Sequence, residues 1–335
     1  MSLTTKRLAF GLVIVTAAII LIAVIFASQV LDPVYQGKRL SEWMDDFAAK
    51  KPSRFYEAVK AIGTNSVPCI VRNLARNDSN IRRKYNDVRN KSAKRIQGFL
   101  PESKPLLQSV HGANVFSYIG INSLPSAIAL LQHPSSTVRE STALGICGLR
   151  RQSVVANRAI PALTIALDDR DEKVRFSTLL AFQEMGVDAS NAVSDITRIL
   201  AGSSQAGGTN FYLRAAAARA LGKIGPPAES ALPTLKAALV APNSYLRGQA
   251  AVGVWRVSGD VDTALPVLLQ EMPNESEHSK WDWIIAVGEM GPQAKTALPQ
   301  LRRELTEDKM SWVLAYVTNA LRKIDPESFE RSPPE

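Results

Sequence analysis

The chain has 335 residues, of which 46% are hydrophobic and 21% are charged, a balance that supports a large buried core and excludes an intrinsically disordered protein. The formal net charge is +9 at pH 7. Residues 72–95 hold nine basic and two acidic side chains, and Lys6 and Arg7 supply the other two charges, so the rest of the chain is neutral.

A long apolar segment follows the short basic tail of residues 1–7. Residues 8–31 carry no charged side chain, and as a helix they would reach about 36 Å, enough to cross a hydrocarbon core of about 30 Å. We expect a single transmembrane anchor. Lys6 and Arg7 favour a cytoplasmic N-terminus, which places the repeats outside the cytoplasm. A cleaved signal peptide is the alternative, although its apolar region is usually only about 7–15 residues long.

Residues 32–51 form a juxtamembrane segment in which we expect a short helix, and an internal repeat then occupies residues 52–324. The first half of the repeat places a basic residue before small and apolar residues, with a glycine eleven positions later, as in "YLRAAAARALGKIG". The second half is an amphipathic run that an apolar residue and a proline open in most copies. These runs lie at residues 67–74, 124–131, 160–167, 193–200, 232–239, 265–272 and 298–305.

Each repeat is predicted to be a pair of antiparallel helices. Glycine ends the first helix because it accepts the left-handed conformation of the cap, and proline opens the second because N–H groups of a first turn have no helical partner. One pair cannot cover its own apolar faces, so neighbouring pairs stack. The sequence therefore predicts an all-α superhelical solenoid of about seven helical pairs, with a polar tail at residues 325–335.

Units such as "YLRAAAARALGKIGPPAESALPTLKAAL" resemble HEAT repeats, particularly the short HEAT-like type first associated with phycobilisome lyases. The resemblance covers roughly residues 52–324. The stretch "VYQGKRLSEWMDDF" at residues 34–47 looks like the start of exported bacterial HEAT-repeat proteins. The resemblance implies a superhelix that binds other proteins. Because the repeats supply their own core, we expect a monomeric repeat domain, which the apolar segment holds at the bacterial inner membrane.

The spacing between the first two amphipathic runs is 57 residues instead of about 33, which leaves a basic insert at about residues 75–105. We predict that it binds an anionic partner, either an acidic protein or anionic lipid headgroups, while a solvated helix without a partner is the alternative. Nucleic acid is disfavoured because only Tyr85 and Phe99 interleave the charges. The candidate residues are Arg82, Arg83, Lys84, Arg89, Lys91, Lys94 and Arg95.

A second set of basic residues recurs once per repeat and is predicted to be structural. Its members are Arg139, Arg175, Arg214 and Arg247. We expect each guanidinium to bond to backbone carbonyls or to an acid such as Asp171 near the preceding turn. The tryptophans of the last repeats are predicted to pack in the core or between repeats, and the alternative is that some line a recognition groove; these are Trp255, Trp281, Trp283 and Trp312.

No pattern of a catalytic or metal site occurs in the sequence. Cys69 and Cys147 are far apart in apolar helical patterns, which predicts buried thiols and no disulfide. His111, His133 and His278 show no paired-ligand spacing, so we expect no metal and no cofactor. The leading interpretation is a membrane-anchored scaffold for protein interaction without catalysis. The alternatives are an enzyme of the phycobilisome-lyase type and a nucleic-acid-binding HEAT-like module.

Overall fold

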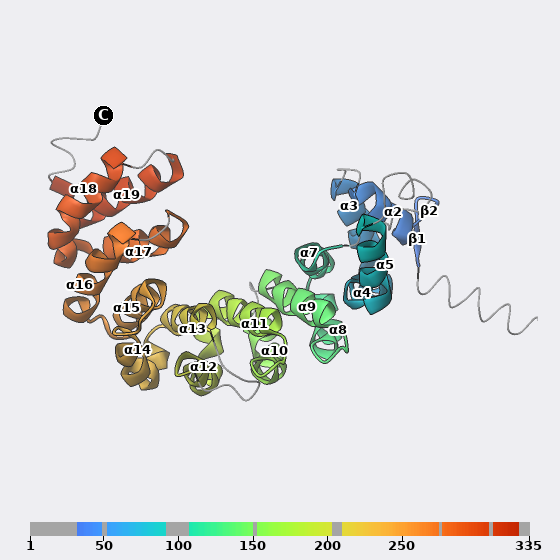
Figure 1. Ribbon diagram of the computed structural model, residues 1–335, viewed down its shortest axis with the longest axis horizontal. Helices are drawn as coiled ribbons and strands as arrows, with labels where there is room; N and C mark the ends of the chain where they lie inside the picture. Colours follow the sequence, from blue (N-terminus) through green and yellow to red (C-terminus); the bar gives the residue numbers. More distant parts are fainter. Residues whose placement is uncertain are drawn as a thin grey trace, which may run out of the picture. The chain divides into compact units, whose positions relative to one another are not determined.

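The computed structural model describes residues 32–48, 52–91, 107–149, 153–202, 210–274, 277–307 and 311–327. The described chain is almost wholly helical and divides into two compact units, unit 1 within Met1–Leu149 and unit 2 within Arg150–Glu335 (Figure 1). No helix in these ranges is both long and apolar enough to span a membrane. The predicted anchor at residues 8–31 lies outside the described residues.

Unit 1 begins with a small hairpin that the sequence analysis did not predict. β1 (Val34–Tyr35) pairs antiparallel with β2 (Lys38–Arg39) across a turn in which Gln36 and Gly37 both have positive φ. Strands of two residues are too short to show an alternating pattern. The expected short helix follows directly as α2. The helices of unit 1 are α2 (Leu40–Ala48), α3 (Pro52–Ile62), α4 (Val67–Ala75), α5 (Asn80–Lys91), α7 (Ser109–Ile119), α8 (Leu124–Leu130) and α9 (Ser136–Gly148).

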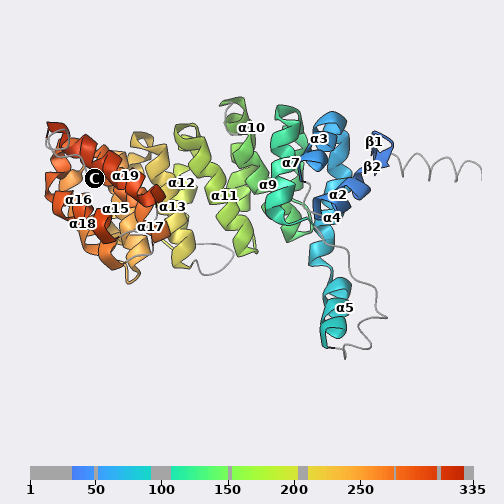
Figure 2. The same cartoon turned by 90° about the horizontal axis from the view of Figure 1, so that it is seen from above.

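The helices of unit 1 share one apolar core, except that α5 stands away from it. Helix α2 packs on α3, α3 on α7, and α7 on α9, around buried side chains that include Leu40, Phe55 and Ile70. Figure 2 shows α5 directed away from the layer of α3, α4 and α7. The short helix η2 (Arg76–Asp78) at its base is held to α9, because the Asp78 carboxylate accepts hydrogen bonds from Thr137 Oγ1 (2.6 Å) and Thr137 N (3.2 Å).

Unit 2 is a stack of helical pairs in two layers. The helices on the inside of its curve are α11 (Glu172–Met185), α13 (Phe211–Ile224), α15 (Ser244–Ser258), α17 (Glu277–Glu289) and α19 (Ser311–Ile324), which we call the inner layer (Figure 1). The outer layer consists of α10 (Ser153–Ala166), α12 (Val193–Leu200), α14 (Leu232–Ala238), α16 (Val261–Glu271) and α18 (Leu298–Glu307). Each inner helix contacts the next inner helix along the chain.

The alanine-rich helix α13 shows why small residues recur in the first half of each repeat. It packs between α11 and α15, and the side chains of its run from Ala215 to Ala218 are all buried. Its backbone also approaches that of α15 closely, since a Cβ added to Gly222 would lie 3.1 Å from the Cα of Gly253. Gly225 ends the helix with φ of +76°, and its N–H donates to the Leu221 carbonyl at 3.0 Å. The stretch is thus a packing unit.

Proline opens the second helix in only part of the repeats. Pro68, Pro125 and Pro233 lie in first turns, as predicted, after the short 3₁₀ helices η1 (Gly63–Ser66), η3 (Ile121–Ser123) and η5 (Pro226–Ala231). The prediction was wrong for Pro161 of α10 and Pro266 of α16, which lie inside their helices. In α16 the reason is the cap, because Asp260 starts the helix at Val261, five residues before Pro266.

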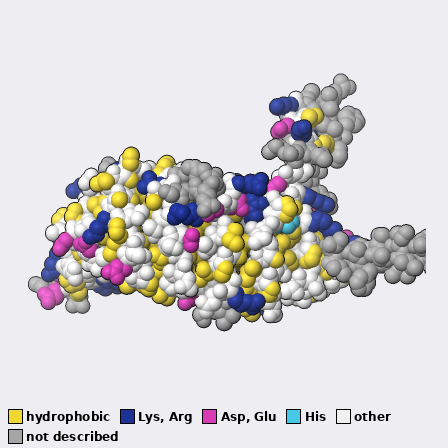
Figure 3. Space-filling model, turned by 90° about the horizontal axis from the view of Figure 1, so that it is seen from below, with side chains coloured by type: hydrophobic (Ala, Val, Ile, Leu, Met, Phe, Trp, Pro, Cys, Tyr) yellow, Lys and Arg dark blue, Asp and Glu magenta, His cyan; other side chains and the backbone are white. Residues whose placement is uncertain are grey.

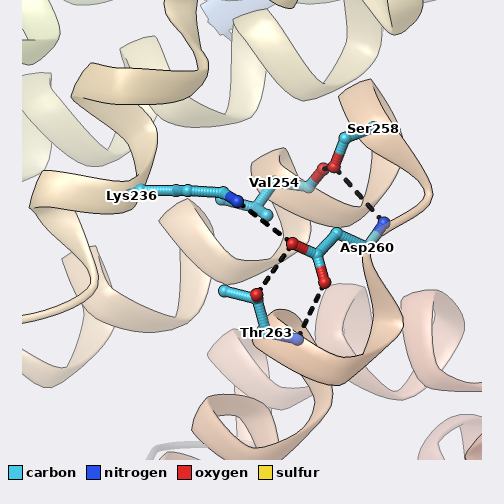
Figure 4. A network of polar contacts seen from close by, with 5 residues as sticks. All are labelled: Lys236, Val254, Ser258, Asp260 and Thr263. Atoms are coloured by element: carbon cyan, nitrogen blue, oxygen red, sulfur yellow. Dashed lines mark hydrogen bonds and ion pairs between the residues drawn. The ribbon is translucent and has the colours of Figure 1, made fainter.

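Asp260 joins three elements of unit 2 at the start of α16 (Figure 4). Its carboxylate accepts hydrogen bonds from Thr263 N (3.0 Å) and Thr263 Oγ1 (2.7 Å), which cap the helix. Lys236 of α14 donates to the same carboxylate at 3.1 Å. The Asp260 N–H donates to Ser258 Oγ at 3.3 Å, and that hydroxyl donates to the Val254 carbonyl of α15 at 2.8 Å. The bonds from Thr263 and Lys236 hold the pKa of Asp260 below its ordinary value.

Candidate protein-interaction surface

The four repeat arginines all donate to backbone carbonyls that precede their own helix, at the end of the previous helix for Arg214 and at the turn for the other three. The donor and acceptor pairs are Arg139 Nη1 with the carbonyls of His133 (2.8 Å) and Pro134 (3.0 Å), Arg175 Nη1 with Asp169 (2.7 Å), Arg214 Nε with Leu200 (2.8 Å), and Arg247 Nη1 with Ala241 (2.7 Å) and Pro242 (2.9 Å). Asp171 is not the acid that pairs with them. Its carboxylate caps α11 by accepting from Lys173 N at 2.9 Å.

Two buried ion pairs reinforce the last repeats, and the sequence analysis missed both. Arg247 donates to both carboxylate oxygens of Glu271 at 2.7 Å, and Lys280 Nζ lies 3.1 Å from Glu304 Oε2. The two glutamate side chains are each 4% exposed. In both pairs a cation on an inner helix meets a glutamate 24 positions later on the following outer helix, and that recurring spacing is the signal that could have revealed them.

A looser cluster of charges lies across three inner helices. Asp282 of α17 is 2% exposed, and two guanidinium groups share it: Arg219 Nε of α13 lies 3.4 Å from Oδ2, and Arg256 Nη2 of α15 lies 3.4 Å from Oδ1. Arg256 Nη2 is also 3.6 Å from Glu289 Oε2 at the exposed end of α17. We call Arg219, Arg256 and Asp282 the arginine cluster.

The arginine cluster leaves buried polar atoms without hydrogen bonds. Arg219 Nε, Arg256 Nη1 and Asp282 Oδ2 are all inaccessible to solvent, and none of them makes a hydrogen bond, although Arg219 Nε and Asp282 Oδ2 face each other at 3.4 Å as an ion pair. Such atoms are rare in folded proteins because each one lacks the bonds it would make to water. In the same unit, Arg247 and Glu271 form a bidentate pair, in which one guanidinium donates two hydrogen bonds of 2.7 Å to one carboxylate.

Aromatic side chains flank the arginine cluster on the inner layer. The Arg219 guanidinium lies 5.0 Å from the ring centre of Trp281, which in turn is 6.3 Å from Tyr316 of α19. Toward the start of α13 and α15, the rings of Tyr212 and Tyr245 are 6.4 Å apart. Tyr212 is 56% exposed, so this inner surface offers apolar area as well as charge to a partner.

The tryptophans divide between packing and surface. Trp283 is fully buried, as the prediction of core packing requires, while Trp255 and Trp281 are partly exposed. The side chain of Trp312 lies outside the described residues.

The basic insert is described only in part. Helix α5 contains Arg82, Arg83, Lys84, Arg89 and Lys91, and the side chains of Lys84 and Lys91 are exposed. Figure 3 shows the described basic side chains on this projecting part in dark blue. The other two candidates, Lys94 and Arg95, and the side chains of Arg82 and Arg83 lie outside the described residues. The structure thus places part of the predicted anion-binding surface on one helix of unit 1.

The described part of the chain contains no group of three histidine, cysteine, aspartate or glutamate residues that could hold a metal ion. Cys69 and Cys147 are both free thiols. Burial, followed by the nearby Asp32 carboxylate, raises the pKa of Cys69 to about 12. Burial also lowers the pKa values of His111 and His133. The side chain of His278 lies outside the described residues.

Comparison with known proteins gives two similar solved structures and one family match. Two crystal structures of engineered proteins are similar to the chain, one at 16% identity over 62% of this chain and 98% of the other, with a TM-score of 0.41. The second has 14% identity over 81% of this chain and 74% of the other, with a TM-score of 0.40. No curated protein matches the sequence. A family model of HEAT repeats matches residues 160–255, so this central part of the solenoid is built from repeats similar to the HEAT type.

Proposed function

We propose that this chain is a helical scaffold that binds another protein through the inner layer of unit 2 and catalyses no reaction. The observation that carries the proposal is the set of solvent-accessible aromatic side chains on consecutive inner helices, which are Tyr212, Tyr245, Trp281 and Tyr316. The similarity of residues 160–255 to HEAT repeats supports it, because stacked helical repeats form extended concave binding surfaces. The last three second-helix runs start at residues 232, 265 and 298, which are 33 residues apart, and this spacing fits the short HEAT-like type.

We further propose that residues 8–31 anchor the chain in the bacterial inner membrane with the repeats outside the cytoplasm. The uncharged apolar run and the basic residues before it support this placement. In this arrangement the basic insert contacts an acidic protein or anionic lipid headgroups. Carbonate and high-salt washing of membranes tests the anchor, since release of a shortened soluble form would establish cleavage instead.

Site-specific photocrosslinking in intact cells tests the interaction. A photoreactive amino acid in place of Tyr212 on the inner layer should give a discrete crosslinked product, which mass spectrometry then identifies. The matched control is Ile165 on the outer helix α10, whose side chain is 64% exposed. Equal products from both positions, or products from Ile165 alone, would contradict binding through the inner layer.

A further inference from the structure

Helix α5 concentrates positive charge outside the core of unit 1. Its 12 residues contain five basic side chains and one acidic side chain, Asp87, so five positive charges less one negative charge leave +4. The helix projects from the layer of α3, α4 and α7 (Figure 2), and none of its described side chains is buried. Because packing within the unit does not account for this charge, the helix offers a surface to an anionic partner.

One face of α5 combines an apolar side chain with cations on both sides. Val88 is 62% exposed. At about 100° per residue, Lys84 and Lys91 lie to one side of it, and both are exposed. Tyr85 lies to the other side with Arg89 beyond it, and both are half-buried. Figure 3 shows basic and hydrophobic side chains next to one another on this projecting part.

This order of side chains is typical of a helix that lies in the interface of a membrane. There an apolar side chain enters the headgroup layer, a tyrosine ring lies at its depth, and lysine stems follow the apolar boundary while their ammonium groups reach the lipid phosphates. Asp87 lies on the opposite side of the helix from Tyr85. Its carboxylate is therefore outside the face that Tyr85, Val88 and Arg89 form.

Hydrogen bonds tie the start of the described chain to the helix that leads to α5. Asp32 directly follows the apolar run of residues 8–31, and its carboxylate accepts bonds from Ser41 N (2.9 Å) and Oγ (2.7 Å) in α2 and from Cys69 Sγ (3.4 Å) in α4. From Cys69 the chain runs through α4 and η2 to Val88, a mostly helical path of about 30 Å. An anchor at residues 8–31 would therefore hold α5 at a high effective concentration beside lipid headgroups, whereas a soluble acidic protein must diffuse to it.

We propose that helix α5 lies against the anionic headgroups of the membrane in which residues 8–31 are anchored. Tyr85 and Val88 enter the interface, and Lys84 and Lys91 bind the lipid phosphates. The contact fixes the orientation of unit 1 at the membrane, because it adds a second point of attachment to the anchor. This inference rests on the proposed function: it requires the anchor, and it assigns lipid, not an acidic protein, to the basic insert.

The full chain in lipid nanodiscs tests the inference. A nitrobenzoxadiazole dye, whose emission depends on polarity, is attached to Val88→Cys in a Cys147→Ala background; Cys69 is buried and should not be labelled. Discs that contain phosphatidylglycerol should raise and blue-shift the emission about threefold or more over discs of phosphatidylcholine alone. Salt at 1 M should abolish the difference, because the screening length falls from about 10 Å at 0.1 M to about 3 Å.

Charge variants separate recognition of lipid from the net charge of the chain. Lys84→Glu combined with Lys91→Glu reverses the two exposed cations beside Val88 and should remove the response to phosphatidylglycerol at low salt. Arg170→Glu combined with Lys173→Glu makes the same change of net charge at exposed positions of unit 2. This matched control should respond as the unreversed chain does.

The outcomes also separate the lipid contact from the anchor. An equal response in both kinds of disc, a response that survives reversal of Lys84 and Lys91, or its loss in the control as well would overturn the inference. A chain that enters phosphatidylcholine discs but gives no response to phosphatidylglycerol would overturn the lipid contact and leave the anchor in place, with an acidic protein as the partner of the insert. A chain that enters neither kind of disc would contradict the anchor and the inference together.

Discussion

At the scale of single residues, Asp260 combines a helix cap with an ion pair, and substitution separates them. Asp260→Ala removes the acceptor for Thr263 and the partner of Lys236, so we expect the free energy of unfolding to fall by about 1 kcal/mol. Asp260→Asn keeps a cap acceptor and should retain most of that stability. Urea denaturation of both variants at pH 7 makes the comparison. Equal losses of unfolding free energy in the two variants would show that the charge of Asp260, and not its role as a helix cap, stabilises the fold.

The lowered pKa of Asp260 predicts how this contribution depends on pH. A carboxyl whose pKa is lower in the folded state adds stability above its unfolded pKa of about 3.9 and loses it as the pH falls through the folded value. The difference in unfolding free energy between wild type and Asp260→Asn should therefore be steady from about pH 7 to pH 5 and shrink below about pH 4. A difference that grows on acidification would contradict this assignment.

The buried pair of Arg247 and Glu271 should be costly to break on one side. Arg247→Ala leaves a carboxylate that is 4% exposed without its cation, which predicts a loss of about 3–5 kcal/mol in unfolding free energy. Arg247→Met combined with Glu271→Leu should recover much of this loss, because no buried charge remains. Arg170→Ala, at an exposed position, is the control and should stay within about 0.5 kcal/mol of wild type. A double variant worse than Arg247→Ala would refute the explanation.

At the scale of helices, the close packing of α15 against α17 depends on Gly248. A Cβ at this position would overlap the indole ring of Trp283, which is fully buried. Gly248→Ala should therefore destabilise the protein by about 1–3 kcal/mol through overpacking. Combining it with Trp283→Phe, which makes room for the methyl group, should cost less than the sum of the two single changes. Strict additivity in thermal unfolding would show that the two residues do not compete for space.

Charge reversal in the basic insert, part of which is helix α5, should weaken binding to anionic membranes without affecting folding. Changing Arg82, Arg83, Lys84, Lys94 and Arg95 to glutamate should leave the fold intact, because the charges of a polar insert contribute little to stability. If the insert binds an anionic membrane, each basic residue contributes about 1 kcal/mol, so association should weaken by several orders of magnitude. Sedimentation with vesicles of graded anionic lipid content compares the two proteins. Identical sedimentation at low salt would leave the insert as a solvated helix.

The elements that sequence predicted best are those set by local chemistry. The glycine at the end of α13 and the proline at the start of α14 each fix backbone conformation without help from the rest of the fold. Pro266 was placed wrongly because the cap at Asp260 outweighs the preference of proline for a first turn. The arginine cluster could not be predicted, since Arg219, Arg256 and Asp282 meet only through the stacking of three repeats. Arg139 and Arg175, in contrast, bond to carbonyls only five or six positions earlier in the chain.

At the scale of the whole molecule, stability should be distributed along the repeats. In a stacked array each repeat is held mainly by its neighbours. Gly248→Ala should therefore reduce the hydrogen-exchange protection of α15 and α17 most, that of α11 less, and leave α3 and α7 in unit 1 unchanged. Hydrogen exchange followed by mass spectrometry resolves these helices. Equal loss of protection throughout the chain would show that the two units unfold as one.

Burial of Cys69 has a practical consequence for measuring such motions. Thiol alkylation requires the thiolate, and with a pKa of about 12 the folded Cys69 has very little of it at neutral pH. Its alkylation rate should therefore record how often the surroundings of α4 open. Both cysteines lie in unit 1, whereas four of the five tryptophans, Trp255, Trp281, Trp283 and Trp312, lie in unit 2. Alkylation of Cys69 thus reports the opening of unit 1, and tryptophan fluorescence reports chiefly the opening of unit 2. Both can be followed in one sample of the native chain without introducing a new residue.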